Sequence, residues 1–204
     1  GITASGNMTI NAGGAITDSG ASVVPGTTSL NANGNNITLD FPGNNFGTVN
    51  LAGANITLTN VSLVNLAGVQ ATGAFGLTVP GTMTVSSPIT GSTINLSSSG
   101  GNVVLNSTVT ASGNLTLAAN AGSITANSSG NISAGGSLSV TAGGGIQLAG
   151  VTSPNVTITA GGGATFINPL TVNGGFLVTA GGGASFNNTI TGGGTLTVNT
   201  AGVT

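Results

Sequence analysis

Asp18 and Asp40 are the only side chains of this 204-residue sequence that ionise near neutral pH. A carboxylate can serve as a general acid or base, or can ligate a hard cation such as Ca²⁺. The two aspartates lie eight residues after Ile10 and ten residues after Leu30, so adjacent turns of a repeat could bring them together. Two acids are few for either task, and the glycine-aspartate nonapeptide of calcium-binding β-rolls is missing. We therefore interpret both as solvated turn residues, and expect no catalytic residue, no metal site and no cofactor.

The residue types that are missing exclude further classes of function. The sequence contains no Lys, Arg, His, Glu, Cys, Trp or Tyr. A Ser-His-Asp triad and a Cys- or His-ligated metal site are therefore impossible, and we expect no enzyme. Without basic side chains the chain cannot neutralise phosphates, so we expect no nucleic-acid partner. No run of 18 apolar residues occurs, which argues against insertion into a membrane.

The composition nevertheless predicts a folded chain. Disordered chains combine low hydrophobicity with high net charge, whereas 38% of these residues are hydrophobic and 1% are charged. Glycine fills 38 of 204 positions, about 19% against a usual share of roughly 7%, and this glycine content disfavours helix. The β-branched residues and their alternation with polar residues favour strands.

Short apolar-polar-apolar strands recur about every 20 residues. The C-terminal members of this series are 94–96, 115–117, 138–140, 156–158, 176–178 and 196–198. Glycine triplets follow three of them, at 143–145, 161–163 and 181–183. The N-terminal part repeats the theme with 8–10, Leu30 and 49–51, whereas the spacing slips between about 59 and 92.

Two further apolar columns follow the turns. Val104, Leu148, Phe166 and Phe186 each stand eight residues after the end of a strand of the first series, and Leu170 and Ile190 stand twelve after. Three short strands per period, separated by small-residue turns, predict a β-solenoid in which one period is one coil. The expected fold is all-β: residues 1–204 form a single-stranded parallel β-helix of about ten coils, less regular at 59–92.

Three segments share a common pattern: NMTINAGGAIT at 7–17, NLTLAANAGSIT at 114–125 and SLSVTAGGGIQL at 137–148. They resemble the repeats of filamentous-haemagglutinin-type exoproteins, which are large bacterial surface adhesins exported by two-partner secretion. The resemblance implies a right-handed parallel β-helix and an extracellular adhesive or matrix fibre on a bacterial cell surface. The absence of Lys and Arg favours an inert structural shaft over a receptor-binding segment.

One outward face is the candidate binding surface. It comprises the polar residues that alternate with the first apolar column: Thr116, Ser139, Thr141, Thr157, Thr159, Thr179 and Thr197. Paired threonines on successive coils resemble the ice-facing arrays of β-solenoid antifreeze proteins, although Asn95, Ala118 and Leu177 interrupt the array. The alternative to a fibre segment is therefore an ice- or carbohydrate-binding module that uses a flat Thr/Asn face.

The expected partners are further copies or neighbouring repeats stacked end to end, and glycans or a cell surface. Neither terminal segment shows a polar cap, so we expect the stack to continue, covalently in a longer chain or by association of subunits. Asn-x-Ser/Thr sequons at Asn55, Asn114, Asn131 and Asn155 are potential glycosylation sites.

Overall fold

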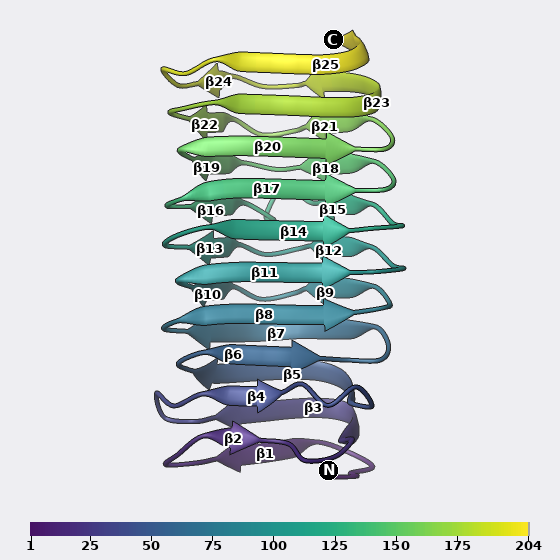
Figure 1. Ribbon diagram of the computed structural model, residues 1–204, viewed down its shortest axis with the longest axis vertical. Coiled ribbons are helices and arrows are strands. Elements are labelled where there is room, and N and C mark those ends of the chain that lie inside the picture. The colour runs from purple at the N-terminus through teal and green to yellow at the C-terminus, as the bar shows by residue number, and fades with distance from the viewer. Residues whose placement is uncertain (204) are drawn as a thin grey trace.

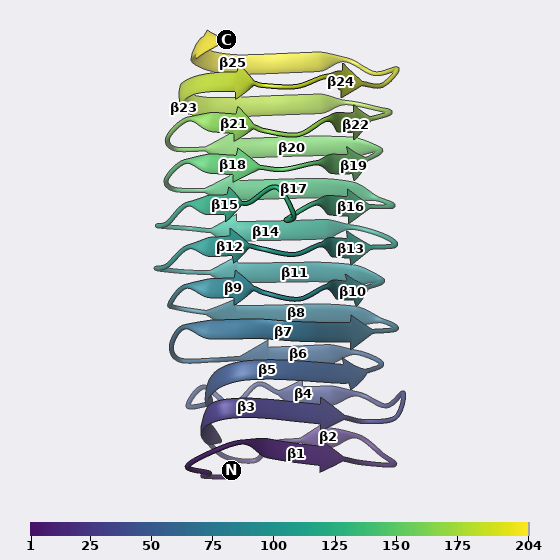
Figure 2. The same cartoon turned by 180° about the vertical axis from the view of Figure 1, so that it is seen from behind.

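The computed structural model describes residues 1–203, which form one stack of parallel strands (Figure 1). The chain winds about ten times around a long axis, and paired residues of neighbouring coils are between 17 apart (Val49 and Leu66) and 23 apart (Val109 and Ile132). The near strands run left to right as the chain climbs, and the far strands return in the opposite direction, so the coil is right-handed (Figure 2). Residues 1–203 contain no helix, and so none that could cross a membrane.

One sheet, which we call the front sheet, contributes a strand to every coil. Its strands are β2 (Ile16–Thr17), β4 (Ile37–Leu39), β6 (Ile56–Thr59), β8 (Ala74–Val79), β11 (Thr93–Ser98), β14 (Leu115–Ala119), β17 (Ser137–Ala142), β20 (Asn155–Ala160), the first half of β23 (Phe176–Phe186) and β25 (Leu196–Val203). They face the viewer in Figure 1.

The rest of each coil differs between the two ends of the molecule. In the N-terminal coils one long strand closes the coil: β3 (Val23–Asn31), β5 (Asn45–Gly53) or β7 (Val64–Ala71), with β1 (Met8–Asn11) paired to β3. In the C-terminal coils two short strands replace it. The second sheet contains β9 (Met83–Val85), β12 (Val103–Leu105), β15 (Ile124–Ala126), β18 (Ile146–Leu148), β21 (Ala164–Phe166) and the end of β23. The third sheet contains β10 (Ile89–Gly91), β13 (Val109–Ala111), β16 (Ile132–Ala134), β19 (Val151–Ser153), β22 (Leu170–Val172) and β24 (Ile190–Thr191).

The core consists of apolar columns that run the length of the stack. Alternate residues of a strand point to opposite sides, so each short strand places one or two apolar side chains inside. The front-sheet column is Leu39, Leu58, Leu77, Leu96, Leu117, Val140, Ile158, Val178 and Val198. Its members from Leu39 to Val178 are at most 5% exposed, so the coil leaves almost no solvent inside.

The structure corrects two sequence assignments. Ile10, Leu30 and Leu51 do not precede Leu96 in the front sheet, because their column continues through Val69 and the third sheet to Ile190. All three columns share the same period, so the period alone cannot tell them apart. The column of Leu148, Phe166 and Phe186 is confirmed by their pairing.

Val104 does not belong to that column. Its neighbours Val103 and Leu105 are fully buried, whereas Val104 is half-buried and pairs with Thr84 and Thr125 on the outside. The turn that precedes β12 is one residue longer than those before β18 and β21, and a shift of one residue moves a side chain to the opposite face.

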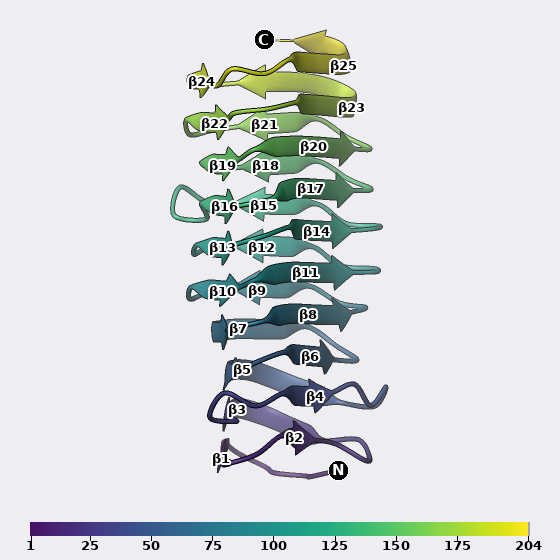
Figure 3. The ribbon, with the colours of Figure 1, turned by 60° about the vertical axis from the view of Figure 1, so that its left-hand side comes forward.

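The slip in spacing at 59–92 coincides with the change in coil shape. The first half of β7 pairs with β9 and the second half pairs with β10, so the long strand divides into two at this level (Figure 3). The front sheet runs through this region unbroken, with Leu77 paired to Leu58 below and to Leu96 above.

Asparagine and glycine cooperate at the corner before the front sheet. The Oδ1 atoms of Asn55, Asn114 and Asn155 accept hydrogen bonds of 2.9–3.0 Å from backbone N–H groups of the following coil. The residues facing these oxygens are glycines 73, 136 and 174, where a Cβ would approach the oxygen to under 3.0 Å. Each asparagine therefore needs a glycine one coil later, and this pairing explains part of the unusual content of both.

Candidate functional site

The outward positions of the front sheet form two straight columns. The first runs Thr17, Thr38, Thr57, Gly76, Asn95, Thr116, Ser139, Thr157, Leu177 and Thr197. The second runs Thr59, Thr78, Ser97, Ala118, Thr141, Thr159, Thr179 and Asn199. Every candidate residue named from the sequence lies in one of these columns, in the register expected.

The geometry of this face is regular, whereas its chemistry is not. Successive coils place like atoms about 4.8 Å apart, and alternate residues of one strand are separated by roughly 7 Å. Thr57/Thr59 and Thr157/Thr159 are complete threonine pairs. The first pair is not among the candidate residues, because the candidates come from the series of strands that begins at 94–96. Gly76 leaves a gap in the first column, and Leu177 is an exposed apolar residue in it. The residues of these two columns offer hydroxyl and amide groups and carry no charge; Asp40, level with Thr59, is the charged residue beside them.

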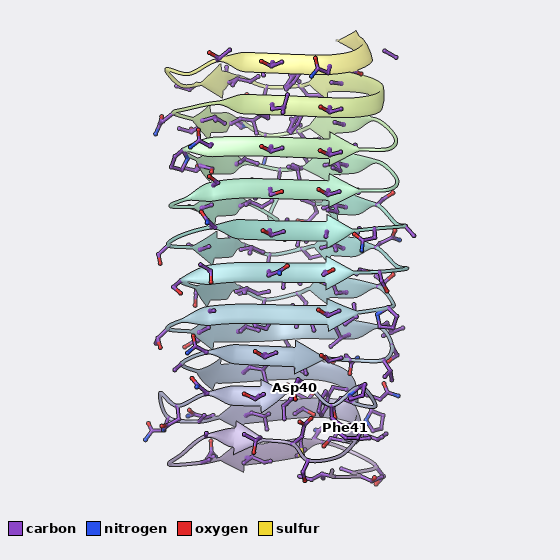
Figure 4. The ribbon with its side chains drawn as sticks, viewed as in Figure 1. Asp40 and Phe41 are labelled. Atoms are coloured by element: carbon purple, nitrogen blue, oxygen red, sulfur yellow. The ribbon has the colours of Figure 1, made fainter. Side chains whose placement is uncertain are left out.

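The two aspartates lie in neighbouring coils but in different surroundings. Thr17 pairs with Thr38, so the next residue, Asp18, aligns with the buried Leu39. Asp18 therefore does not align with Asp40, which follows Leu39 in the next coil. Asp40 is exposed at the end of β4, beside Phe41 (Figure 4), as expected of a solvated turn residue.

Asp18 does not fit the interpretation as a solvated turn residue. Its side chain is half-buried, and its Oδ2 accepts hydrogen bonds from the Phe41 backbone N–H (3.3 Å) and from the Asn44 amide. Its Oδ1 is buried and has no hydrogen-bond partner within residues 1–203. The carboxylate therefore supports the corner of the next coil.

Asn44 and Asn60 are buried polar residues that were not among the candidate residues named from the sequence. Asn44 is fully buried; its Oδ1 accepts the Ser22 N–H at 2.9 Å, and its Nδ2 donates to the Leu39 carbonyl at 3.1 Å. The Asn60 amide bonds both the N–H (2.6 Å) and the carbonyl (3.2 Å) of Phe46. In each case the side chain replaces backbone pairing that the corner lacks. Their only signal in the sequence is a position directly before or within a turn.

The four sequons named above, out of eleven in the sequence, have a structural explanation. Asn55, Asn114 and Asn155 hold the corner before the front sheet, and Asn131 accepts the Gly150 N–H at 2.9 Å. The Ser or Thr two residues later is the outward residue of the following strand. An asparagine corner followed by an apolar-polar strand therefore produces the sequon pattern without any need for glycosylation.

Comparison with known proteins gives one positive result. A family model described as repeats of unknown function (DUF5649) matches residues 1–52 and 91–153, segments of 52 and 63 residues that together make 115 of the 204. The unmatched stretch between them contains the level at which the long strand divides. No curated protein and no solved structure matches the chain. On the evidence of two matched segments and a coil that repeats from end to end, the chain belongs to the DUF5649 family of repeats.

Proposed function

We propose that this chain is a non-catalytic segment of an extracellular structural or adhesive fibre on a bacterial surface. The observation that supports the proposal is the uninterrupted stack of about ten coils whose outer columns carry almost no charge. Neighbouring repeats or copies joined end to end would extend the same hydrogen-bonding pattern. A heterologous contact of this kind does not close on itself, and it generates a fibre.

The finer identity, a segment of a filamentous-haemagglutinin-type exoprotein, is part of the proposal. It draws on the resemblance of the repeats at 7–17, 114–125 and 137–148. The last two occupy equivalent strands of neighbouring coils, β14–β15 and β17–β18, whereas 7–17 spans β1 and β2. A chain without Lys or Arg offers no cleavage site to trypsin-like proteases, and this suits an external fibre.

Electron microscopy of the purified chain at high concentration tests the proposal. We expect unbranched filaments with an axial repeat near 4.8 Å. Their formation should be nearly independent of salt, because two carboxylates per chain provide little charge to screen. Immunogold labelling of intact producing cells tests the location. A monodisperse monomer in solution together with label confined to the cell interior would overturn the proposal.

The register of the front face supports a second candidate, an ice-binding module. Two outward columns of mainly small polar residues continue in phase over the whole front sheet. Thermal hysteresis measured on the isolated chain tests this function. Thr157→Lys on the front face should abolish hysteresis, whereas Thr171→Lys on the third sheet should leave it unchanged. Absence of hysteresis in the unmodified chain rejects the candidate.

A further inference from the structure

One coil departs from the repeat. Val109 and Ile132 pair across 23 residues, whereas the next two steps of the same column, to Val151 and Leu170, are 19 residues each. The additional residues form a loop at 127–130, which we call the strap, between β15 and β16. The strap leaves the coil outline in Figure 3, and in Figure 2 it rises toward the coil above.

The strap is held in one conformation. The Asn127 Oδ1 accepts the Ser129 N–H at 2.8 Å, and the Asn127 carbonyl accepts the Gly130 N–H at 2.9 Å. The Asn168 amide donates to the Ser128 carbonyl at 3.1 Å, from 40 residues further along the chain. The strap therefore spans the corner of an intervening coil. A loop that is already ordered loses little conformational entropy when a ligand binds beside it.

A hollow of about 270 Å³ lies on the third sheet, where the strap rejoins the coil at Asn131. Its floor is β13, β16 and β19, with Gly150 and Pro169 along the same border as Asn131. The hydroxyl-bearing residues that line it are Thr108, Thr110, Ser133 and Thr152. Within residues 1–203 none of these hydroxyls forms a hydrogen bond in the structure, so each can both donate to and accept from a ligand.

We propose that this hollow, the strap groove, binds a neutral saccharide. Sugar hydroxyls need partners that both donate and accept, and the groove supplies four hydroxyls and the Nδ2 donor of Asn131, whose Oδ1 accepts the Gly150 N–H. An anionic ligand would find no cation, since the chain contains no Lys, Arg or His. The volume lies near the lower limit of about 300 Å³ for ligand sites, which suits one or a few sugar units. Insertions in repeat proteins commonly mark the binding face.

The groove is a better site than the hollow beside Gly76 on the front sheet. There the space arises from one missing side chain, that of Gly76, and no insertion lengthens the coil beside it. At the strap, a longer coil, a bridging hydrogen bond and unoccupied hydroxyls coincide. The proposal rests on the adhesive form of the proposed function and gives its ligand class and location.

The chain provides a matched pair of variants for the test. Thr110, Ser133 and Thr152 lie in the groove, whereas Thr125, Thr165 and Ser185 lie in one outward column of the second sheet, away from both the groove and the front face. The groove variant is T110V/S133A/T152V, and the control variant T125V/T165V/S185A makes the same chemical changes elsewhere. Circular dichroism and thermal unfolding check that both remain folded like the unmodified chain.

Binding is measured on an array of neutral hexose and N-acetylhexosamine oligosaccharides, with sulfated and sialylated glycans for comparison. We expect the unmodified chain to bind neutral members, and the control variant to bind them equally. The groove variant should bind at least about tenfold more weakly, the effect of losing one or two net hydrogen bonds. Asn168→Ala, which frees the strap, should weaken binding by a smaller factor.

Three results would overturn the assignment: no binding to neutral glycans, preference for anionic glycans, or equal loss in both triple variants. Filament formation is scored on the same samples by electron microscopy. Filaments without glycan binding would reject the proposed saccharide site and support the proposed fibre. Glycan binding without filaments would support the saccharide site and argue against the fibre.

Discussion

The N-terminal and C-terminal coils close the same corner in different ways. This corner follows the front sheet, and in the N-terminal coils it is filled by the buried side chains of Asn44 and Asn60, which bond to backbone groups. In the C-terminal coils glycine triplets let the backbones approach and bond directly, as from Gly144 to Gly122 (2.8 Å) and from Gly162 to Gly144 (2.9 Å). A buried asparagine side chain and closely packed glycine backbones are therefore two ways to provide hydrogen-bond partners for the buried peptide groups of this corner.

The largest effect should come from adding a methyl group to a glycine corner. A Cβ at Gly161 would overlap the Gly143 carbonyl of the preceding coil, whereas a Cβ at Gly13 would meet nothing within 4 Å. Gly161→Ala should lower the free energy of unfolding by about 3 kcal/mol, because the backbones must separate. Gly13→Ala should change it by less than about 0.5 kcal/mol. Urea unfolding of both variants measures the difference, and equal stability would show that the C-terminal corner is not closely packed.

Removal of an asparagine corner should come second. Asn60→Ala leaves the buried N–H and carbonyl of Phe46 without partners, and we expect a loss of about 2 kcal/mol. Asn199→Ala, at an exposed position of the C-terminal front sheet, should cost less than about 0.5 kcal/mol. The measurement is again urea unfolding. If the two variants were equally stable, the amide of Asn60 would not replace backbone pairing.

Aromatic packing should produce a smaller difference in the free energy of unfolding between the two regions. Phe176 packs edge-on against Phe166 and Phe186, with ring centroids 5.6 and 6.2 Å away, and those two rings stack at 4.9 Å. Phe75 occupies the same front-sheet column at the level where the long strand divides, between Ile56 and Ile94. Phe176→Leu should therefore cost about 1 kcal/mol more than Phe75→Leu. Thermal unfolding of the two variants tests this, and the reverse order would contradict an aromatic contribution.

The rate of asparagine deamidation should differ between the two regions. Asn33–Gly34 is an exposed turn with positive φ at both residues (47° and 79°), and Gly34 donates no backbone hydrogen bond within residues 1–203. In Asn173–Gly174 the Gly174 N–H is held by the Pro154 carbonyl at 2.6 Å. Attack of the glycine nitrogen on the asparagine Cγ expels ammonia, and water then opens the succinimide to aspartate or isoaspartate.

We expect this deamidation to be several times faster at Asn33 than at Asn173 in the folded chain at pH 8. Peptide mass spectrometry after timed incubation measures both rates in one sample. The urea-unfolded chain is the control, since the two sites should then react at similar rates. Equal rates in the folded chain would show that the Gly174 hydrogen bond gives no protection.

The fold could be predicted from the sequence because its signal is repeated in almost every coil. The outward register of Thr116, Ser139 and Thr157 follows from strand alternation alone, and pairing in the structure confirms it. The apolar period assigns Val104 to the inward column, whereas its side chain points outward. One extra residue in the preceding turn shifts the strand by one position and so exchanges its inward and outward side chains, and the period does not reveal such a shift. The burial of Asn60 was missed because turn asparagines are usually exposed, and only the path of the next coil encloses this one.

The hydrogen bonds between coils lie along the long axis, and this direction determines how the molecule bears a pull on its ends. Tension would load the bonds at the end coil first, so that coils peel off one at a time instead of shearing together. Each coil released would lengthen the chain from about 4.8 Å to roughly 65 Å. The strap would interrupt this sequence, because the Asn168–Ser128 bond ties one coil to the second coil above it. A fibre built this way would extend in steps under load, and so absorb mechanical work that would break a rigid rod.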